Sequence, residues 1–145
     1  MHVPKAERVA RWRASAQQDR DLASEIVERY AHLACYHAQQ AAEKALKAKI
    51  TDLHGDAVPS HLGRMLLAAL GELGAMPPDH IRAAVLALDA YYIPTRYPDA
   101  LDFADASQTY GATEARAALE RADSVLAWVD HATDESATRN PLNES

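Results

Sequence analysis

Several features that commonly stabilise or define a small protein are scarce in this chain of 145 residues. It has one cysteine, so it forms no internal disulfide. It has only five glycines and one phenylalanine but many alanines, a composition that favours helices. No apolar run approaches the ~20 residues that a membrane span needs, and no apolar stretch follows the first charges as in a signal peptide. We therefore expect a cytoplasmic protein with no membrane segment.

The chain also lacks an excess of basic residues. Its formal net charge is −6, whereas proteins that bind nucleic acid through bulk charge are usually basic. The composition therefore argues against that mode of binding, although a local basic patch stays open.

The familiar motifs of nucleotide and metal chemistry are absent as well. There is no G-x-x-x-x-G-K-[ST] phosphate loop, no G-x-G-x-x-G, no H-E-x-x-H and no C-x-x-C pair. His32 and His37 are five residues apart, so on a helix they point about 140° apart and do not form a metal-binding pair. We expect no cofactor and no metal.

The segment 30–53 carries the strongest pattern in the chain. On a helical projection its alanines gather on one side, which predicts a helix that neighbouring helices can approach closely. Four polar residues, His37, Gln40, Lys44 and Lys47, follow one another at spacings of 3, 4 and 3 and so form one stripe. A charged stripe of this kind usually faces water, but it is also the first candidate binding site.

Apolar periodicity and capping residues predict further helices at about 5–28, 60–74, 78–94 and 113–132. Ser60 is the expected N-cap of the second of these, and Gly55 the C-cap of the central helix. The sequence thus predicts an all-α, up-and-down bundle of about five helices in a single domain, 1–132. Residues 133–145 are polar and are expected to form a flexible tail.

Several single residues have a structural reading that we prefer over a functional one. Trp12 and Cys35 are expected to be core residues rather than a stacking platform and a nucleophile. The charged segment 19–21 is expected to be a solvated turn with local ion pairs rather than a carboxylate pair, because residues two apart on a helix point in different directions. His61 is expected to cap or pack at the start of its helix.

A second polar cluster lies at the end of the predicted fourth helix and in the segment that follows it. The cluster consists of Tyr91, Tyr92, Arg96 and Tyr97 with Asp99, and it combines stacking faces with a guanidinium. The connection 94–111 is long for a compact domain. Such a loop could fold over a neighbouring helix and meet the stripe. Alternatively, Arg96 could simply hold the loop through Asp99.

Taken together, these segments resemble a known family. The sequence A-C-Y-H-A-Q-Q-A-A-E-K-A-L-K-A at 34–48, S-H-L at 60–62, Y-Y-I-P-T-R-Y-P-D at 91–99 and A-W-V in the last helix are similar to the prokaryotic HEPN domain. The resemblance covers about residues 8–130. It implies a helical bundle, a homodimer, association with a minimal nucleotidyltransferase, links to toxin–antitoxin systems, and binding of a nucleotide or RNA.

The chain departs from the pattern of those HEPN proteins that cleave RNA. They carry an Arg followed after four to six residues by a His, as a metal-independent catalytic pair. Here Arg96 matches the Arg, but Leu101, Asp102 and Phe103 stand where the His would be. Without that imidazole no general base is in place, so we expect a non-nuclease member with no catalytic residues.

Two functions from different classes follow. The first is a non-catalytic binding module that presents His37, Gln40, Lys44, Lys47, Tyr92, Arg96 and Tyr97 to a nucleotide or another anion and pairs with a nucleotidyltransferase. The second is a ribonuclease in which His37 or His61 meets Arg96 in the fold or across a dimer. A homodimer is expected in either case, because Leu33 and Tyr36 are apolar residues on the polar side of the central helix.

Overall fold

The computed structural model describes residues 3–92 and 110–138, with side chains as far as residue 131. Within these residues it contains helices and no strands. The helices are α1 (Lys5–Ile26), α2 (Ala31–His54), α3 (Gly63–Glu72), α4 (Asp79–Asp89) and α7 (Ala112–Thr138). The predicted all-α bundle is confirmed.

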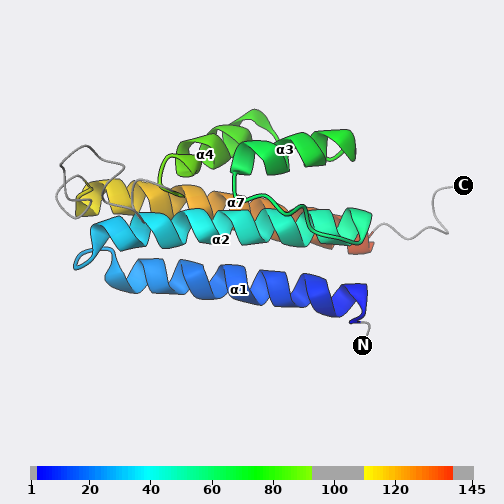
Figure 1. Cartoon of the computed structure of the whole chain (residues 1–145), viewed down its shortest axis with the longest axis horizontal. Helices are drawn as coiled ribbons and strands as arrows, with labels where there is room; N and C mark the ends of the chain where they lie inside the picture. Colours follow the sequence, from blue (N-terminus) through cyan, green and yellow to red (C-terminus); the bar gives the residue numbers. More distant parts are fainter. Residues whose placement is uncertain (1–2, 93–109, 139–145) are drawn as a thin grey trace, which may run out of the picture.

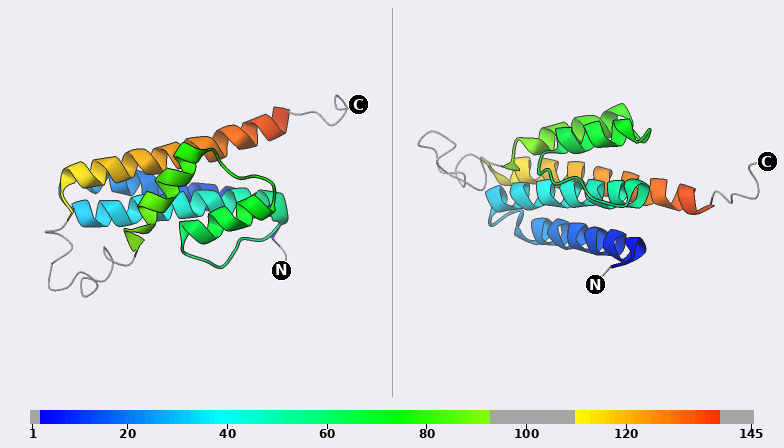
Figure 2. Two further views of the ribbon diagram at one scale, coloured as in Figure 1. Left: turned by 90° about the horizontal axis from the view of Figure 1, so that it is seen from above. Right: turned by 45° about the vertical axis from the view of Figure 1, so that its right-hand side comes forward.

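Three long helices, α1, α2 and α7, lie side by side, and the short helices α3 and α4 form a second layer on them (Figure 1). The middle helix α2 runs between α1 on one side and the α3–α4 pair on the other, with α7 alongside it. The views in Figure 2 show the same order from above and from the side. Every other helix therefore packs around α2.

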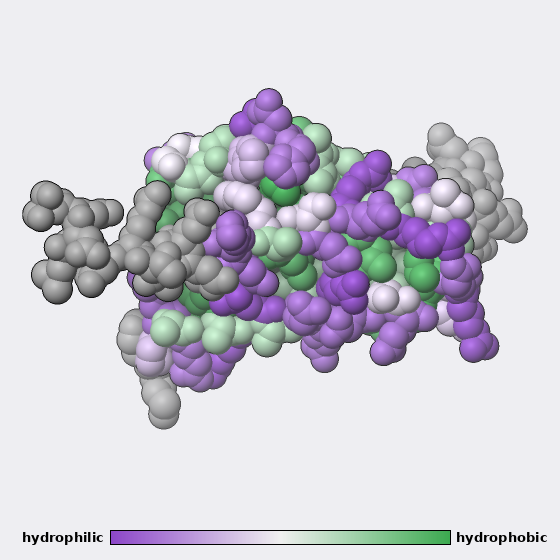
Figure 3. All heavy atoms as spheres, turned by 180° about the vertical axis from the view of Figure 1, so that it is seen from behind, coloured by the Kyte–Doolittle hydropathy of each residue, from purple (hydrophilic) through white to green (hydrophobic). Residues whose placement is uncertain are grey.

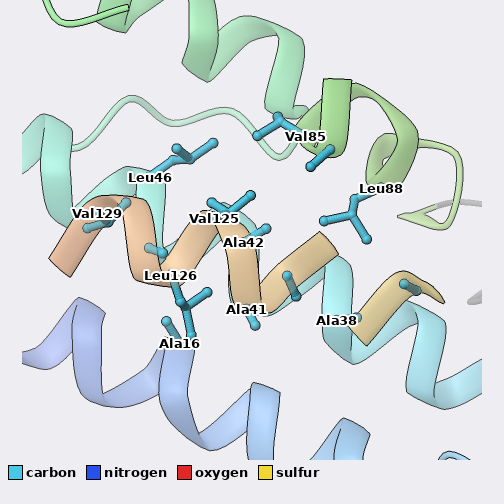
Figure 4. Packing of buried hydrophobic residues seen from close by; sticks show 14 of the residues in the cluster. Ala16, Ala38, Ala41, Ala42, Leu46, Val85, Leu88, Val125, Leu126 and Val129 are labelled. Atoms are coloured by element: carbon cyan, nitrogen blue, oxygen red, sulfur yellow. The ribbon is translucent and has the colours of Figure 1, made fainter. Parts of the chain in front are cut away.

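The core follows from the alanines of α2. Ala38, Ala41 and Ala45 are almost completely buried, as predicted, and the larger Leu46 and Ile50 fill the space nearer the C-terminal end of the helix. Figure 4 shows their partners, which come from three helices: Ala16 of α1, Val85 and Leu88 of α4, and Val125, Leu126 and Val129 of α7. Small side chains at the contact allow helix axes to come close, so α2 is enclosed on several sides at once.

Charged residues attach α1 to α7 at the rim of this core. Arg13 donates to Asp130 at 2.5 Å, and Arg20 donates to Asp123 at 2.7 Å. Arg20 was expected to be solvated together with its neighbours in the segment 19–21. The structure shows the expected local ion pair, with Arg20 3.5 Å from Asp21, but Arg20 also joins α1 to α7, because the two helices lie close enough for their side chains to meet.

Two helix boundaries differ from the sequence prediction. The helix predicted to begin after Ser60 begins at Gly63, and Ser60 Oγ accepts from the backbone N–H of Leu62 at 3.2 Å. The helix predicted to reach Pro94 ends at Asp89 and is followed by a turn. The first difference has a clear cause, because the Asp89 carboxylate accepts from the N–H groups of Gly63 at 2.6 Å and Arg64 at 3.0 Å. The end of α4 thus caps the start of α3, a contact between segments that local periodicity does not reveal.

The ends of α2 and α7 are closer to expectation. Gly55 takes the left-handed conformation (φ 99°) and ends α2, as predicted. The last helix begins at Ala112 and continues to Thr138, so it extends into the segment 133–145 that the sequence predicts as a polar tail. The long connection 94–111 lies outside the described residues except at its last positions, 110 and 111.

The surface is mixed in character. Seen from behind the view of Figure 1, hydrophilic and hydrophobic residues alternate over the bundle without one continuous apolar expanse (Figure 3). Large apolar side chains that are more than a third exposed are spread over several helices, among them Leu22, Leu33, Met65 and Leu86. In the described part of the chain, no helix is both long and apolar enough to cross a membrane.

The α3–α4 contact gives a first prediction. A methyl group on Gly63 would stand 2.4 Å from Val85 Cγ1 and 2.8 Å from Asp89 Oδ1, so Gly63→Ala should push α3 away from α4. We expect it to lower the free energy of unfolding by about 1–3 kcal/mol, the usual cost of overpacking. Chemical denaturation measures this change.

Gly111→Ala is the matched control, since nothing lies within 4 Å of the added methyl group there. Equal stability of the two variants would contradict the packing of α3 on α4.

Candidate functional site

The polar stripe of α2 lies against α1, and its central cations meet a carboxylate of that helix. Asp19 Oδ2 lies 2.6 Å from Lys44 Nζ, and Asp19 Oδ1 lies 2.9 Å from His37 Nδ1. The side chains of all three residues are no more than about a quarter exposed. The stripe is therefore not the solvated face that periodicity favoured, and the expectation that Asp19 is solvated was wrong.

A second carboxylate, Glu43, lies close to a histidine and a lysine. It is only 3% exposed, and its carboxylate lies 3.2 Å from His61 Nδ1 and 3.9 Å from Lys47 Nζ. His61 comes from the connection between α2 and α3, whereas Lys47 is one turn along α2. His61 was expected to cap or pack; it pairs with a buried acid and keeps most of its side chain exposed.

The two carboxylates respond to burial in opposite ways. Burial raises the pKa of Asp19, but the hydrogen bonds and positive charges of His37 and Lys44 outweigh it and leave that pKa below its ordinary value. Burial also raises the pKa of Glu43, and there Lys47 and His61 do not compensate, so the pKa stays above its ordinary value. The ionised form of Glu43 is thus less well stabilised than that of Asp19.

Aromatic rings adjoin this buried acid. Tyr92 stacks on His61 with the ring planes 10° apart and the centroids 5.7 Å apart, and its other neighbour is Tyr36 at 6.5 Å. Tyr36 in turn meets the edge of His37 at 5.2 Å. The four rings link the stripe of α2 to the end of α4, and we call them the aromatic cluster.

The glutamines of α2 complete this surface. Gln40 donates to Gln39 at 2.7 Å, and the buried Gln39 donates to the backbone carbonyl of His61 at 3.4 Å. Gln39 therefore helps to hold the connection that carries His61. The structure brings five of the seven predicted site residues into one region, His37, Gln40, Lys44, Lys47 and Tyr92. The other two, Arg96 and Tyr97, lie outside the described residues.

Neighbouring tyrosines that look alike in the sequence have different roles. Tyr91 is buried, donates its hydroxyl to Glu114 and meets the ring of Tyr110 at 5.4 Å. Burial and the Glu114 carboxylate both raise the pKa of Tyr91. Tyr91 therefore belongs to the packing between α4 and α7, and only Tyr92 faces the candidate site.

Two further expectations can be compared with the structure. Cys35 is completely buried, and burial with the nearby Glu114 raises its pKa to about 12, so it is a core residue as expected. Trp12 is not part of the buried core; it is partly exposed, and Lys47 Nζ lies 5.3 Å from its ring centroid. The prediction of a core anchor was wrong, because α1 presents Trp12 at its edge with α2 rather than toward α7.

Sequence reasoning missed Asp19 and Glu43, the acids that organise the site. Each is separated by 18 residues from its histidine partner, so no local spacing in the sequence indicates these pairs. Within the residues that the structure describes, no group of three or more His, Cys, Asp or Glu side chains could hold a metal ion.

Comparison with known proteins agrees with this architecture. The family model described as "HEPN domain" matches residues 9–132. No curated protein matches the chain significantly. Among solved structures, TT1696 from Thermus thermophilus is 37% identical, with a TM-score of 0.78 over 86% of this chain and 97% of its own. ST0689, described as an archaeal HEPN homologue, is 29% identical, with a TM-score of 0.67 over 85% of this chain and 95% of its own.

The opposite pKa directions of the two acids predict opposite pH effects. Because the pKa of Asp19 is lowered in the folded state, its contribution is present above the unfolded value of about 4 and is lost as pH falls below it. Asp19→Asn should therefore cost about 1–3 kcal/mol at pH 7 and progressively less below pH ~4. For Glu43 the folded pKa is raised, so stability falls as pH rises through that pKa, and Glu43→Gln removes this fall.

Urea unfolding at intervals between about pH 3 and pH 7 measures both effects. As pH rises, the free energy of unfolding of Asp19→Asn should fall relative to that of the natural chain, and that of Glu43→Gln should rise relative to it. Parallel pH profiles for the two variants would contradict the assignment.

Proposed function

Because this chain belongs to the HEPN domain family, we propose that it is a non-catalytic HEPN-domain protein that binds a nucleotide or another anionic ligand and partners a minimal nucleotidyltransferase. The module would act in a toxin–antitoxin, stress or defence system. The partner and the setting are what membership in the family suggests, and the ligand class is supported by the chemistry of the site.

The observation that carries the proposal is the aromatic cluster beside the polar stripe. Stacking of a nucleobase on an aromatic ring is worth about 1–3 kcal/mol, and tyrosine offers such a face at a small entropic cost. Tyr36 and Tyr92 are only partly buried, and His61 is largely exposed beside them. Tyr92 has both His61 and Tyr36 as stacked neighbours, so a flat, uncharged group would lie against the exposed His61 ring, which Tyr92 supports.

The anionic part of the ligand needs cations, and the structure ranks the candidates. Lys44 and His37 are already bound to Asp19, and Lys47 lies close to Glu43. These residues thus shape and orient the stripe more than they attract an anion. Arg96 and Tyr97 follow Tyr92 closely in the sequence, so we assign the main phosphate contact to Arg96, whose guanidinium can bind two oxygens at once.

We also propose a homodimer. Leu33, near the start of α2, is 38% exposed, which leaves an apolar side chain on the polar side of the helix. Tyr36, its neighbour on that side, contributes less than expected because it packs on Tyr92 and His37. Light scattering at micromolar concentration that returned only the monomer mass would contradict the dimer.

A second function, a metal-independent ribonuclease, is favoured by one specific observation. The buried Glu43 holds His61 through Nδ1, which leaves Nε2 of a largely exposed ring as the nitrogen that can meet a substrate. A carboxylate that orients an imidazole is a common arrangement for a general base. We keep this function second because no His follows Arg96 at the spacing of the family's catalytic pair.

The binding proposal predicts loss of affinity from changes in the cluster. We expect AMP or ATP to bind the natural chain, and Tyr92→Ala and Arg96→Ala each to weaken that binding about tenfold or more, from lost stacking and lost phosphate contact. Isothermal titration measures the affinities. Tyr30→Ala, which truncates an exposed tyrosine elsewhere on the molecule, is the matched control.

Melting temperatures complete this experiment. A variant Arg96→Ala that melts several degrees lower with unchanged binding would make Arg96 a structural anchor and contradict the site. Lys44→Ala is less informative, because it also breaks the part-buried ion pair with Asp19.

The non-catalytic assignment predicts that the purified protein leaves a structured RNA intact, in EDTA and in magnesium alike. Gel electrophoresis after prolonged incubation is the measurement. Cleavage that disappears in Arg96→Ala and in either His61→Ala or His37→Ala would replace the binding function with the ribonuclease.

A further inference from the structure

Trp12 stands at the edge of a pocket that is separate from the aromatic cluster. The pocket has a volume of about 320 Å³ and is lined by Arg8, Arg11, Trp12 and Ser15, all on one side of α1. A site of this size is at the lower end of what small-molecule ligands occupy. The indole therefore has an open side, which a core residue would not have.

A buried lysine holds the ring in place. Lys47 Nζ lies 5.3 Å from the centroid of the indole and 3.9 Å from Glu43, and Lys47 itself is buried. Lys47 is not among the residues that line the pocket. A ring fixed in this way loses little freedom when a second flat group stacks on it.

Two guanidinium groups stand beside the open side of the ring. Arg8 is fixed, because it donates to the carbonyl oxygens of Val3 and Gly55 and to Asp56. Arg11 is exposed and meets only Glu7, at 2.8 Å one turn earlier, among the described residues. An exposed pair at this spacing is worth about 0.3–0.5 kcal/mol, so Arg11 can exchange Glu7 for a better anion at little cost.

Basic residues are concentrated in the first half of α1. Between residues 3 and 15 there are four basic residues and one acidic residue. Arg8 and Arg13 are paired with Asp56 and Asp130 of other segments, so Arg11, whose pair with Glu7 is exposed on both sides, is the cation that can turn to an added anion.

We propose that Trp12, Arg11 and Arg8 form a second binding site, for a flat heteroaromatic ring that carries a phosphate. The ring stacks on Trp12, and Arg11 binds the phosphate, while Arg8, held by Asp56 and two carbonyl groups, forms a fixed wall of the pocket. A free nucleotide and an unpaired residue of single-stranded RNA share this chemistry. The site uses neither Tyr92 nor Arg96, so its test does not depend on whether the function proposed above is correct.

Tryptophan fluorescence provides the test, because the chain has only two tryptophans. In Trp128→Phe, Trp12 is the sole source of the signal. We expect AMP or a short single-stranded oligoadenylate to quench that signal in a saturable manner, and adenosine, which lacks the phosphate, to do so about tenfold more weakly. Saturation by AMP identifies a free nucleotide as the ligand, and saturation by the oligoadenylate alone identifies RNA.

Arg11→Ala in this background should weaken the quenching about tenfold. Arg82→Ala is the control, since Arg82 is a partly exposed arginine on another helix that pairs with an aspartate one turn away, and it should change nothing. Tyr92→Ala should leave the quenching intact, which separates this site from the aromatic cluster. Circular dichroism confirms that each variant is folded.

No saturable quenching by either probe, or equal effects of Arg11→Ala and Arg82→Ala, would overturn the proposal and leave Trp12 as a cover over Lys47. Quenching that Tyr92→Ala abolishes would place the ligand in the aromatic cluster and would also overturn it.

Discussion

Enclosure of α2 is the constraint on which the rest of the structure depends. Its alanines allow α1, α7 and the α3–α4 pair to come close together, so most of the helix has no contact with water. This arrangement gains apolar burial along the whole helix. It also removes the solvent that the polar residues of α2 would otherwise face.

The charge pairs follow from that enclosure. A lysine or glutamate inside a helix bundle must find an opposite charge, because an isolated buried ion is too costly. Lys44 and His37 are matched by Asp19 of α1, and Glu43 is matched in part by Lys47 and His61. The stripe that looks solvated in one helix is therefore the polar layer between several.

Glu43 is the member of this layer that packing alone does not explain. Its pKa is raised by burial, so it reduces stability when it is ionised, and a glutamine of the same size would avoid that loss. Acids whose pKa is shifted by burial in this way concentrate at functional sites. Glu43 lies beside His61, on which Tyr92 stacks, in a chain of the HEPN domain family. For this reason we place the proposed binding function at the aromatic cluster.

Local patterns in the sequence were sufficient for the helices, the alanine core, the burial of Cys35, the C-cap at Gly55 and the family. Each of these depends on residues within a few turns of one another, or on motifs that can be read directly from the chain. Tertiary structure alone decided that Asp19 and Glu43 organise the stripe, that Asp89 of α4 caps α3, and that Trp12 lies outside the core. These contacts join residues that are distant in the chain, and helical periodicity shows which side of a helix a residue occupies but not which neighbour meets that side.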